Sequence, residues 1–492
     1  MSMIRVEDLT FSYPGSYDAI FSHVSFQMDT NWKLGLIGRN GRGKTTLLQL
    51  LMGRYEYSGT ITSSVPFAYF PYSVPCPQRP AAQVLAELCP AAEEWEQLRE
   101  LSYLEVDPEA LERPFFTLSN GEQTKVQLAA LFLNQGRFLL IDEPTNHLDT
   151  AGRALVSAYL KRKRGFLLVS HDRSFLDGCV DHILSLNRAD IDVQSGNFSS
   201  WLVNFQRQQA FELAQSRRLQ KEVSRLQQAA QRTTSWSDQV ERSKYGGKNS
   251  GLKVDRGFVG HKSAKMMRRT KQTATRQQRA LEERAQLLKN RETWSDLKLT
   301  SLAHHAQQLV TFSGLSLHYD GRAVCGPLDF TLRQGERVAL EGKNGSGKSS
   351  ILKAILGRPL DHTGRITLAS GLVISYVPQD TDHLRGSLSA FAQAQHIEES
   401  LFKAILRKMG FARVQFEKDL ADYSGGQKKQ VLLAASLCEQ AHLYIWDEPL
   451  NFIDLYTRMQ IEALLVRCGP TLLFVEHDRA FQQAVATRTI QL

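Results

Sequence analysis

A series of short motifs occurs twice in this chain, in the same order and at nearly constant spacing. The glycine-rich loop GRNGRGKT begins at Gly38, and its second copy, GKNGSGKS, begins at Gly342, 304 positions later. An Asp-Glu pair begins at Asp142, and its second copy begins at Asp447, 305 positions later. Several motifs repeated at one offset are typical of a tandem duplication. We therefore expect two domains of one fold, separated by a segment that occurs once.

Each glycine-rich loop follows a β-like apolar run and precedes a helix-prone segment, which is the context of a Walker A loop. In such a loop, backbone N–H groups at a helix N-terminus surround phosphate oxygens, and the lysine supplies a cation for the β and γ phosphates. The loops therefore predict two ATP sites. The expected ATP-binding residues of the two loops are Gly38, Asn40, Gly41, Gly43, Lys44, Thr45, Thr46, Gly342, Asn344, Gly345, Gly347, Lys348, Ser349 and Ser350.

Both Asp-Glu pairs end a buried, apolar run, 138–141 in the first copy. Burying two carboxylates without a partner is costly, whereas a bound metal ion and a substrate water relieve that cost. We expect the aspartates to hold Mg²⁺ together with the loop hydroxyls and the glutamates to orient the attacking water. The expected metal ligands are Thr45, Asp142, Ser349 and Asp447, and the expected catalytic glutamates are Glu143 and Glu448.

The segment LSNGEQ at 118–123, repeated as YSGGQK at 423–428, resembles the signature motif of ABC-type ATPases. The resemblance implies that this motif completes the ATP site of the opposite domain, so Lys44 would face Ser424 and Lys348 would face Ser119. It implies a monomer whose two domains pair head to tail within one chain. The further ATP-binding residues implied are Ser119, Gly121, Glu122, Ser424, Gly425, Gly426 and Gln427.

Other motifs of the same family occur in order. His171 and His477 match its switch histidine, which contacts the γ-phosphate, and Tyr13 and Tyr319 match an aromatic residue that stacks on adenine. Gln379 matches a glutamine that ligates Mg²⁺ or a water. The first copy departs here, because Tyr72 occupies that position and cannot act as an amide ligand. We expect unequal hydrolysis at the two sites.

The segment between the copies is polar and basic. Residues 201–300 contain 22 Lys and Arg against 9 Asp and Glu. No Pro or Gly interrupts residues 205–242, where Leu219, Val223 and Leu226 recur at helical spacing; Leu281, Ala285 and Leu288 repeat this pattern. Glycine-rich stretches at 245–251 and 257–260 predict a reversal between two helices.

The sequence predicts an α/β protein with two tandem ABC-type P-loop ATPase domains joined by a long antiparallel helical hairpin. The expected domains are 1–198, 199–300 and 301–492. No apolar run approaches the length of a membrane span, and no export signal is evident at Met1 to Val24, so a cytoplasmic location is expected. The six scattered cysteines are expected to be reduced.

The sequence DEPTNHLD at 142–149 resembles the corresponding motif of the ABC-F branch. The stretches 28–44 and 444–451 resemble the sequences of its Lsa-type antibiotic-resistance group. The resemblance covers nearly the whole chain. It implies ATP and Mg²⁺ as cofactors, and the bacterial ribosome as partner near the tRNA exit site, through large-subunit rRNA and tRNA. It implies displacement of lincosamides, pleuromutilins and streptogramin A compounds by the linker tip. The expected RNA contacts are Lys244, Tyr245, Lys248, Lys253, Arg256, Phe258, Lys262 and Lys265.

Other interpretations of the same residues remain open. The basic hairpin is also compatible with a housekeeping translation factor, with a DNA-repair or chromosome ATPase, or with a solvated coiled coil that merely carries positive charge. A further alternative is the ATPase subunit of an exporter. The basic linker and the lack of a hydrophobic docking segment stand against it, so no membrane partner is expected.

Overall fold

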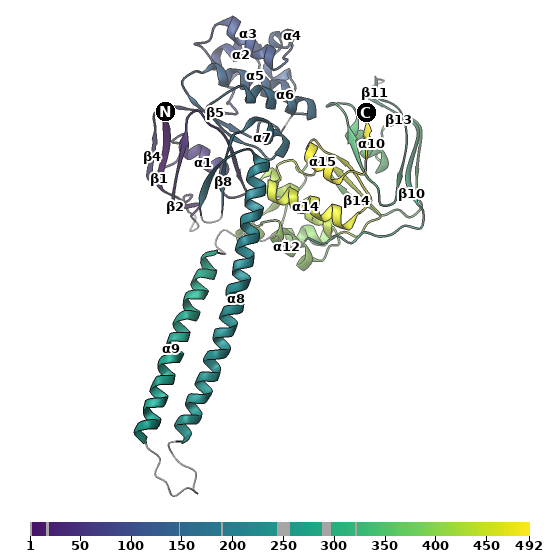
Figure 1. Ribbon diagram of the computed structural model, residues 1–492. Coiled ribbons are helices and arrows are strands. Elements are labelled where there is room, and N and C mark those ends of the chain that lie inside the picture. Colours follow the sequence, from purple (N-terminus) through teal and green to yellow (C-terminus); the bar gives the residue numbers. More distant parts are fainter. Residues whose placement is uncertain are drawn as a thin grey trace. The chain divides into compact units, whose positions relative to one another are not determined.

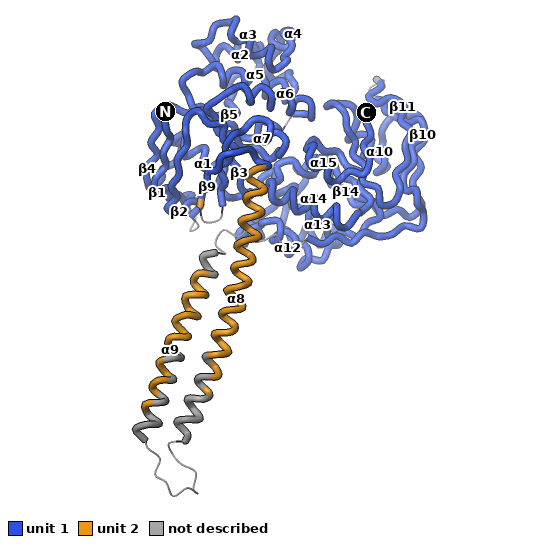
Figure 2. Tube along the Cα trace, in the orientation of Figure 1, with its two compact units in different colours: residues 1–187, 191–199, 294–492 blue, residues 188–190, 200–293 orange. Residues whose placement is uncertain are grey.

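The computed structural model describes residues 2–15, 19–146, 148–187, 190–243, 256–287, 297–319 and 322–492. The chain divides into two compact units (Figure 2). One unit comprises residues 1–187, 191–199 and 294–492, and the other comprises 188–190 and 200–293. The first unit contains both copies of the repeated motifs.

A twisted sheet with the strand order β5-β6-β7-β3-β8-β9 carries the first set of motifs (Figure 1). Its strands are parallel except β9, which pairs antiparallel with β8. Apolar residues fill these strands on both faces, as expected for a parallel sheet that is covered on both sides. The strands are β3 (Lys33–Gly38), β5 (Phe67–Phe70), β6 (Phe138–Asp142), β7 (Phe166–Val169), β8 (His182–Leu186) and β9 (Ile191–Ser195).

An antiparallel sheet with the order β2-β1-β4 packs against the parallel one. Its strands are β1 (Met3–Phe11), β2 (Phe21–Asp29) and β4 (Ser58–Ser63). Leu36 of β3 and Leu47 and Leu48 of helix α1 (Lys44–Leu51) share one core with Ile4 and Met28 of this sheet. The core therefore lies between the sheets and holds α1, which begins at the phosphate-loop lysine.

The remaining helices of the first ATPase domain follow the sheet strands in sequence. They are α2 (Ala81–Leu88), α3 (Glu94–Tyr103), α4 (Pro108–Glu112), α5 (Asn120–Leu133), α6 (Thr150–Lys161) and α7 (Arg173–Cys179). The helix α5 begins at the signature motif, and α7 begins directly after the switch histidine. The motifs therefore lie at strand ends and helix starts, where side chains and free backbone N–H groups reach a ligand.

The second set of motifs lies on a parallel sheet with the order β14-β15-β16-β12-β17, next to an antiparallel sheet β11-β10-β13. The strands are β10 (Gln308–Tyr319), β11 (Arg322–Arg333), β12 (Arg337–Glu341), β13 (Asp361–Leu368), β14 (Ile374–Val377), β15 (Leu443–Asp447), β16 (Leu472–Val475) and β17 (Arg488–Gln491). The helices are α10 (Lys348–Ile355), α11 (Leu388–Ala394), α12 (Glu399–Lys408), α13 (Gly425–Cys438), α14 (Leu455–Cys468) and α15 (Arg479–Val485).

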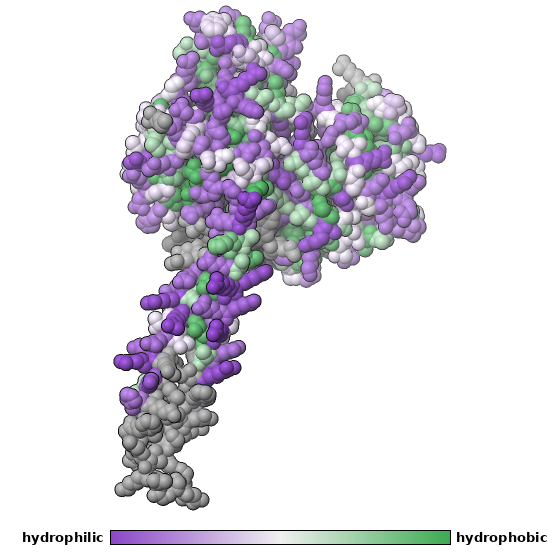
Figure 3. All heavy atoms as spheres, viewed as in Figure 1, coloured by the Kyte–Doolittle hydropathy of each residue, from purple (hydrophilic) through white to green (hydrophobic). Residues whose placement is uncertain are grey.

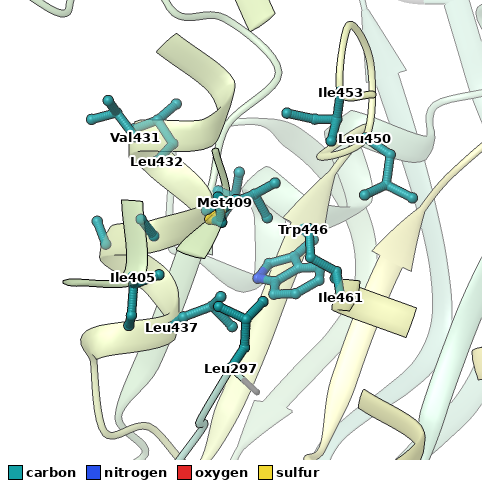
Figure 4. Packing of buried hydrophobic residues seen from close by; sticks show 14 of the residues in the cluster. Leu297, Ile405, Met409, Val431, Leu432, Leu437, Trp446, Leu450, Ile453 and Ile461 are labelled. Carbon is teal, nitrogen blue, oxygen red and sulfur yellow. The ribbon is translucent and has the colours of Figure 1, made fainter. Parts of the chain in front are cut away.

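Trp446 of β15 is at the centre of the larger core of this domain (Figure 4). Its ring is buried, and its indole N–H donates to the Ser436 hydroxyl at 3.1 Å. Leu297, expected in the connecting segment, is buried in the same core, and its carbonyl accepts a 2.6 Å hydrogen bond from Arg467. The end of the connecting segment thus contacts the core of the second ATPase domain.

The second compact unit is a pair of long helices, α8 (Phe198–Ser243, whose first two residues belong to the other unit) and α9 (Arg256–Leu287). They run antiparallel side by side (Figure 1), and Leu219 and Val223 of α8 are buried with Ala280 of α9. At about 1.5 Å per residue, the 46 residues of α8 span about 70 Å. The expected helical hairpin is therefore present among the described residues.

Two details of the hairpin differ from the sequence-based expectation. Residues 257–260, expected in a turn, lie in the first turns of α9, because a long helix can accommodate the cost of about 1 kcal/mol for each glycine. Leu281, expected on the inner face, is 38% exposed, whereas its neighbour Ala280 is buried. At about 100° per residue, a shift of one position turns the side chain away from the partner helix.

Among the described residues, no helix combines the length and the apolar character needed to cross a membrane.

Candidate active sites

The first phosphate loop has the backbone of an anion-binding turn. Gly43 caps α1 in a left-handed conformation with a φ of 89°, and a Cβ there would lie 2.5 Å from the Ile20 side chain. Lys44 is buried, and its ammonium donates to the carbonyl of Gly38 at 2.9 Å and to the side chain of Asn40 at 3.3 Å. The loop thus presents backbone N–H groups and one cation around a common point. We call this site one.

Asp142, at the end of β6, lies directly beside the phosphate loop. Its Oδ2 accepts hydrogen bonds from the Thr45 hydroxyl at 3.0 Å and from the Tyr69 hydroxyl at 3.1 Å. Burial raises the pKa of Asp142, and these two hydrogen bonds oppose that rise. The hydroxyl and the carboxylate are therefore adjacent, as two ligands of one hard cation would be.

Glu143 follows with a left-handed backbone, φ 50°, which is uncommon for a residue with a side chain. Its N–H donates to the Val169 carbonyl at 3.0 Å, and its Oε1 lies 3.3 Å from His171 Nε2 without a hydrogen-bond partner among the described residues. Burial, and then the charge of Asp142, raises the pKa of Glu143 to about 8. Burial also lowers the pKa of His171. Backbone strain of this kind concentrates at functional sites.

The second phosphate loop repeats this geometry around Lys348, and we call it site two. Lys348 Nζ donates to the carbonyls of Gly342 at 2.9 Å and Lys343 at 2.7 Å. The Ser349 hydroxyl donates to Asp447 at 3.0 Å. Burial lowers the pKa of Lys348 and raises that of Asp447 to about 6.

Glu448 has the same left-handed backbone, φ 46°, but its carboxylate has more partners than that of Glu143. Oε2 accepts a 2.6 Å hydrogen bond from the Asn451 amide, and Oε1 lies 3.5 Å from His477 Nε2. Although burial alone raises the pKa of Glu448, hydrogen bonds from His477 and Gln379 hold it below its ordinary value. The two glutamates therefore differ in their electrostatic surroundings.

The signature serines cap their own helices. The Ser119 hydroxyl accepts from the N–H of Glu122, and the Ser424 hydroxyl accepts from the N–H of Gln427, both at 3.3 Å. Each forms a capping box at the start of α5 or α13, so backbone N–H groups of that first turn remain directed outward.

Each signature motif shares a cavity with the phosphate loop of the other ATPase domain. A cavity of about 340 Å³ contains site one together with Ser424, Gly425, Gly426 and Gln427. A cavity of about 910 Å³ contains site two, including Ser350 and Gln379, together with Ser119, Gly121 and Glu122. The carboxylate of Asp454 acts on the pKa of Lys44, and that of Asp149 acts on the pKa of Lys348, in each case opposing the effect of burial. Both cavities are thus built from both halves of the chain.

The expected aromatic positions are only partly described. The Tyr13 hydroxyl lies 2.8 Å from the hydroxyl of Thr46, and its ring is half exposed beside Phe11 and Tyr55. The backbone of Tyr319 lies in β10, and its side chain is outside the described residues.

Tyr72 is turned toward helix α5. Its N–H donates to the Gln127 side chain at 3.0 Å, and its hydroxyl accepts from Asn134 at 3.2 Å.

Sequence reasoning missed two features of the sites. No role was expected for Tyr69, yet its hydroxyl reaches Asp142. Arg153 and Arg458 are buried and form ion pairs with Asp172 at 3.0 Å and Asp478 at 3.1 Å, directly after the switch histidines. Their separation of 305 positions, equal to that of the two Asp-Glu pairs, was the signal that could have identified them.

Most expected RNA contacts of the linker lie beyond what the structure describes. Lys244, Tyr245, Lys248 and Lys253 fall outside the described residues, and the side chains of Arg256, Phe258 and Lys262 of α9 do so too. Lys265 is exposed on α9.

The residues of both sites fit a nucleoside triphosphate with a divalent cation. Two glycine-rich turns, two buried ammonium groups and two hydroxyl–carboxylate pairs form a donor set for phosphate oxygens and a hard metal ion. Bound Mg²⁺ would neutralise charge on the phosphates. With such a ligand bound, Lys44 and Lys348 would lie against the phosphates, and Glu143 and Glu448 would be the carboxylates next to them.

Comparisons with known proteins agree with this geometry. The sequence model of one protein family, described as ABC transporter, matches residues 21–146 and 325–451. The ribosome protection protein VmlR of Bacillus subtilis strain 168 is 28% identical over 483 residues, which cover 96% of this chain and 83% of that protein. The energy-dependent translational throttle protein EttA of Haemophilus influenzae is 24% identical over 528 residues, covering 96% of this chain and 88% of that protein.

Among solved structures, a crystal structure of the archaeal ribosome recycling factor aABCE1 with a ribosomal stalk protein shares this fold. The TM-score is 0.64 at 18% sequence identity, and the match covers 98% of this chain and 87% of that one.

Proposed function

This chain belongs to the ABC transporter family, as a tandem ATPase of the ABC-F type, and from that premise we propose that it protects bacterial ribosomes from antibiotics. In this proposal the protein binds the ribosome near the tRNA exit site. Its linker tip then displaces lincosamides, pleuromutilins or streptogramin A compounds from the peptidyl-transferase centre, and ATP hydrolysis drives release.

The observation that carries the proposal is the similarity to VmlR, whose name describes it as a ribosome protection protein. The similarity extends over 96% of this chain, so it includes the helical segment between the two ATPase domains. A resemblance confined to the ATPase motifs would not favour a ribosomal partner over any other.

The described part of the linker supports an RNA partner. On α8, Arg207, Arg218, Lys221, Arg225 and Arg232 are all exposed and follow one another at steps of 11, 3, 4 and 7 residues. These spacings keep them on one face of a helix, and we call them the α8 basic stripe. Phe211, 68% exposed, lies next to this stripe and offers a ring on which a base can stack.

Helix α9 carries a similar face. Lys265, Arg268, Arg276 and Arg279 are exposed and lie within about 80° of one another around the helix, at about 100° per residue. Figure 3 shows hydrophilic side chains along the described part of this unit, and the side chains that the structure describes on the two helices form no broad apolar face for a lipid surface. Rows of guanidinium and ammonium groups match the phosphate backbone of RNA.

The roles of the site residues belong to the same proposal. We assign water orientation to Glu143 and Glu448, Mg²⁺ binding to Asp142 and Asp447 with the adjacent hydroxyls, and γ-phosphate contact to the switch histidines. The domain limits 1–198, 199–300 and 301–492 likewise remain a proposal.

A sedimentation experiment tests the function. Glu143→Gln/Glu448→Gln removes both proposed catalytic carboxylates while preserving the shape of the sites, so ATP should hold the two domains together. We expect the ATP-loaded double variant to pellet with bacterial 70S ribosomes and to lower their bound radiolabelled lincomycin at least fivefold.

One control accompanies it. The same protein with Lys44→Ala/Lys348→Ala should neither pellet nor lower the bound drug, since the phosphates lose their cations. Stable pelleting with drug occupancy unchanged would contradict ribosome protection.

A housekeeping translation factor is the second candidate, and the similarity to the translational throttle protein EttA favours it. It predicts a different result, in which the double variant pellets and halts translation in a drug-free extract while the bound drug stays in place.

A further inference from the structure

Site two contains a buried lysine that site one does not have. Lys429 lies in the first turns of α13 and is only 2% exposed. At the equivalent position of α5, 305 residues earlier, is Thr124, whose hydroxyl donates to the Asn120 carbonyl of its own helix at 2.8 Å. A lysine is rarely fully buried unless its ammonium has specific partners, so its contacts are informative.

The Lys429 ammonium bridges two segments of site two. It donates to the carbonyl of Pro378 at 2.8 Å and lies 3.4 Å from the carbonyl of Asp447. Pro378 directly precedes Gln379, and Asp447 directly precedes Glu448. The Lys429 side chain therefore links the backbone segment before Gln379 to the backbone segment before Glu448. A threonine is too short to span this distance.

A buried carboxylate accompanies the lysine. Glu476 is 3% exposed and accepts hydrogen bonds from the N–H of Leu450 at 2.7 Å and from the N–H of His477 at 3.2 Å. The negative charge of Glu476 is the largest electrostatic contribution that opposes burial in setting the pKa of Lys429, which falls to about 8. The glutamate thus balances the lysine and also ties down the backbone of the switch histidine.

Site one has neutral residues at all the equivalent positions. Ser170 replaces Glu476 and Thr145 replaces Leu450, and their hydroxyls lie 3.3 Å apart. The lysine and the glutamate therefore occur together in one half of the chain, and neither occurs at the equivalent position of the other half. This is expected of two residues that act together.

We propose that Lys429 is a positioning residue of site two. It fixes the positions of Gln379 and Glu448 relative to each other for hydrolysis, with Glu476 as a nearby opposite charge. The proposal rests on the roles assigned above to Gln379 and Glu448. It makes site two the faster of the two sites, because the backbone of site one is not bridged in this way.

Single-site ATPase assays on the full chain test it, without ribosomes, so failure of the proposed ribosomal function would not affect the result. Glu143→Gln leaves only site two active, and Glu448→Gln leaves only site one. In the first background, Lys429→Met should lower kcat about tenfold and change the KM for ATP less than threefold. In the second background, the same change should leave kcat within twofold.

The second background is the decisive control, because α13 also carries the Ser424 motif of site one. A merely structural disturbance of α13 would lower turnover at both sites, and that result would overturn the proposal. Thr124→Met is the matched change on α5 and should leave site-one turnover within twofold.

If removal of the Lys429 charge near buried Glu476 prevents Lys429→Met from folding, Lys429→Met/Glu476→Gln removes both buried charges. This double variant should unfold at the temperature of its Glu143→Gln parent but keep the tenfold loss of kcat. Full turnover in either variant would refute a positioning role.

Discussion

The side-chain amide of Asn40 donates a 2.8 Å hydrogen bond to the backbone carbonyl of Phe452, which lies 412 positions later in the chain. The same carbonyl lies 2.5 Å from the point where Gly426 would carry a Cβ. The phosphate loop of one half therefore meets the signature motif and the loop after β15 of the other half, with no room for a methyl group between them.

Gly426→Ala should consequently impair site one. The new methyl group would contact the Phe452 carbonyl oxygen, which no rotamer change can move, so the loop after β15 would have to shift and take with it the hydrogen-bond acceptor of Asn40 in the phosphate loop. We expect the kcat of site one, measured in the Glu448→Gln background, to fall about tenfold. The control is Gly425→Ala, whose Cβ would have its nearest neighbour at 3.8 Å in the Phe452 ring. Equal activity of the two variants would contradict this packing.

The two proposed catalytic glutamates, Glu143 and Glu448, should respond oppositely to removal of their charge. The pKa of Glu143 is raised to about 8, so the folded protein retains a proton that the unfolded chain releases near pH 4.5. The stability of the folded state therefore falls as the pH rises from about 4.5 to about 8. In nucleotide-free protein with EDTA, Glu143→Gln should therefore raise the Tm at pH 8 by about 2–4 °C, and by less at pH 5.5.

Glu448→Gln provides the contrast. Its carboxylate has a lowered pKa, so the charge contributes stability above the unfolded-state pKa, and this contribution disappears only as the pH falls through the folded-state pKa. Calorimetry should show a Tm no higher than that of the parent at either pH. A stabilising Glu448→Gln would show that the two carboxylates are in equivalent surroundings after all.

Tyr69→Phe should weaken the cation site of site one. The phenol donates to Asp142 Oδ2, and without it the pKa of Asp142 rises further, so fewer molecules present a carboxylate. We expect the Mg²⁺ concentration for half-maximal site-one ATPase activity to increase about threefold, and by more below pH 6. Tyr376→Phe is the matched control at site two, since no hydrogen bond joins Tyr376 to Asp447 among the described residues. A threefold effect there as well would show that the hydrogen bond from Tyr69 to Asp142 is not the cause.

Neutralising the α8 basic stripe should reduce the salt dependence of ribosome binding. Each side chain that contacts a phosphate contributes about 0.7–0.9 to the slope of log K against log salt. Arg218→Gln/Lys221→Gln/Arg225→Gln should therefore lower that slope by about 2. Arg365→Gln/Arg413→Gln/Lys418→Gln removes the same charge from the surface of the second ATPase domain, and its slope should match the parent.

Much of the ATPase architecture was predictable, because phosphate chemistry restricts which residues can serve. Lys44, Thr45 and Asp142 could be assigned from their order and spacing, and the structure places them within one cavity. The pairing of Lys348 with Ser119 followed from the resemblance to a known family, because local sequence says nothing about a partner 229 positions away.

Other features depend on tertiary packing and left no local pattern. Whether Leu281 or Ala280 faces α8 depends on the register of two packed helices, which one amphipathic pattern does not specify. The contact of Tyr69 with Asp142 joins neighbouring strands whose registration appears only in the folded sheet. The Lys429–Glu476 pair has no motif at all and became visible only through burial.

That pair also limits how the two halves of the gene can exchange sequence. Long tandem repeats are prone to recombination that copies one half over the other. Copying only the α5 segment over α13 would delete Lys429 and leave buried Glu476 with one positive charge fewer nearby, so that Arg458 alone would offset its burial. The reverse copy would insert a lysine near Ser170, which stands at the position of Glu476 and carries no charge. Lys429 and Glu476 are therefore expected to be kept or lost together, which preserves the difference between the two halves.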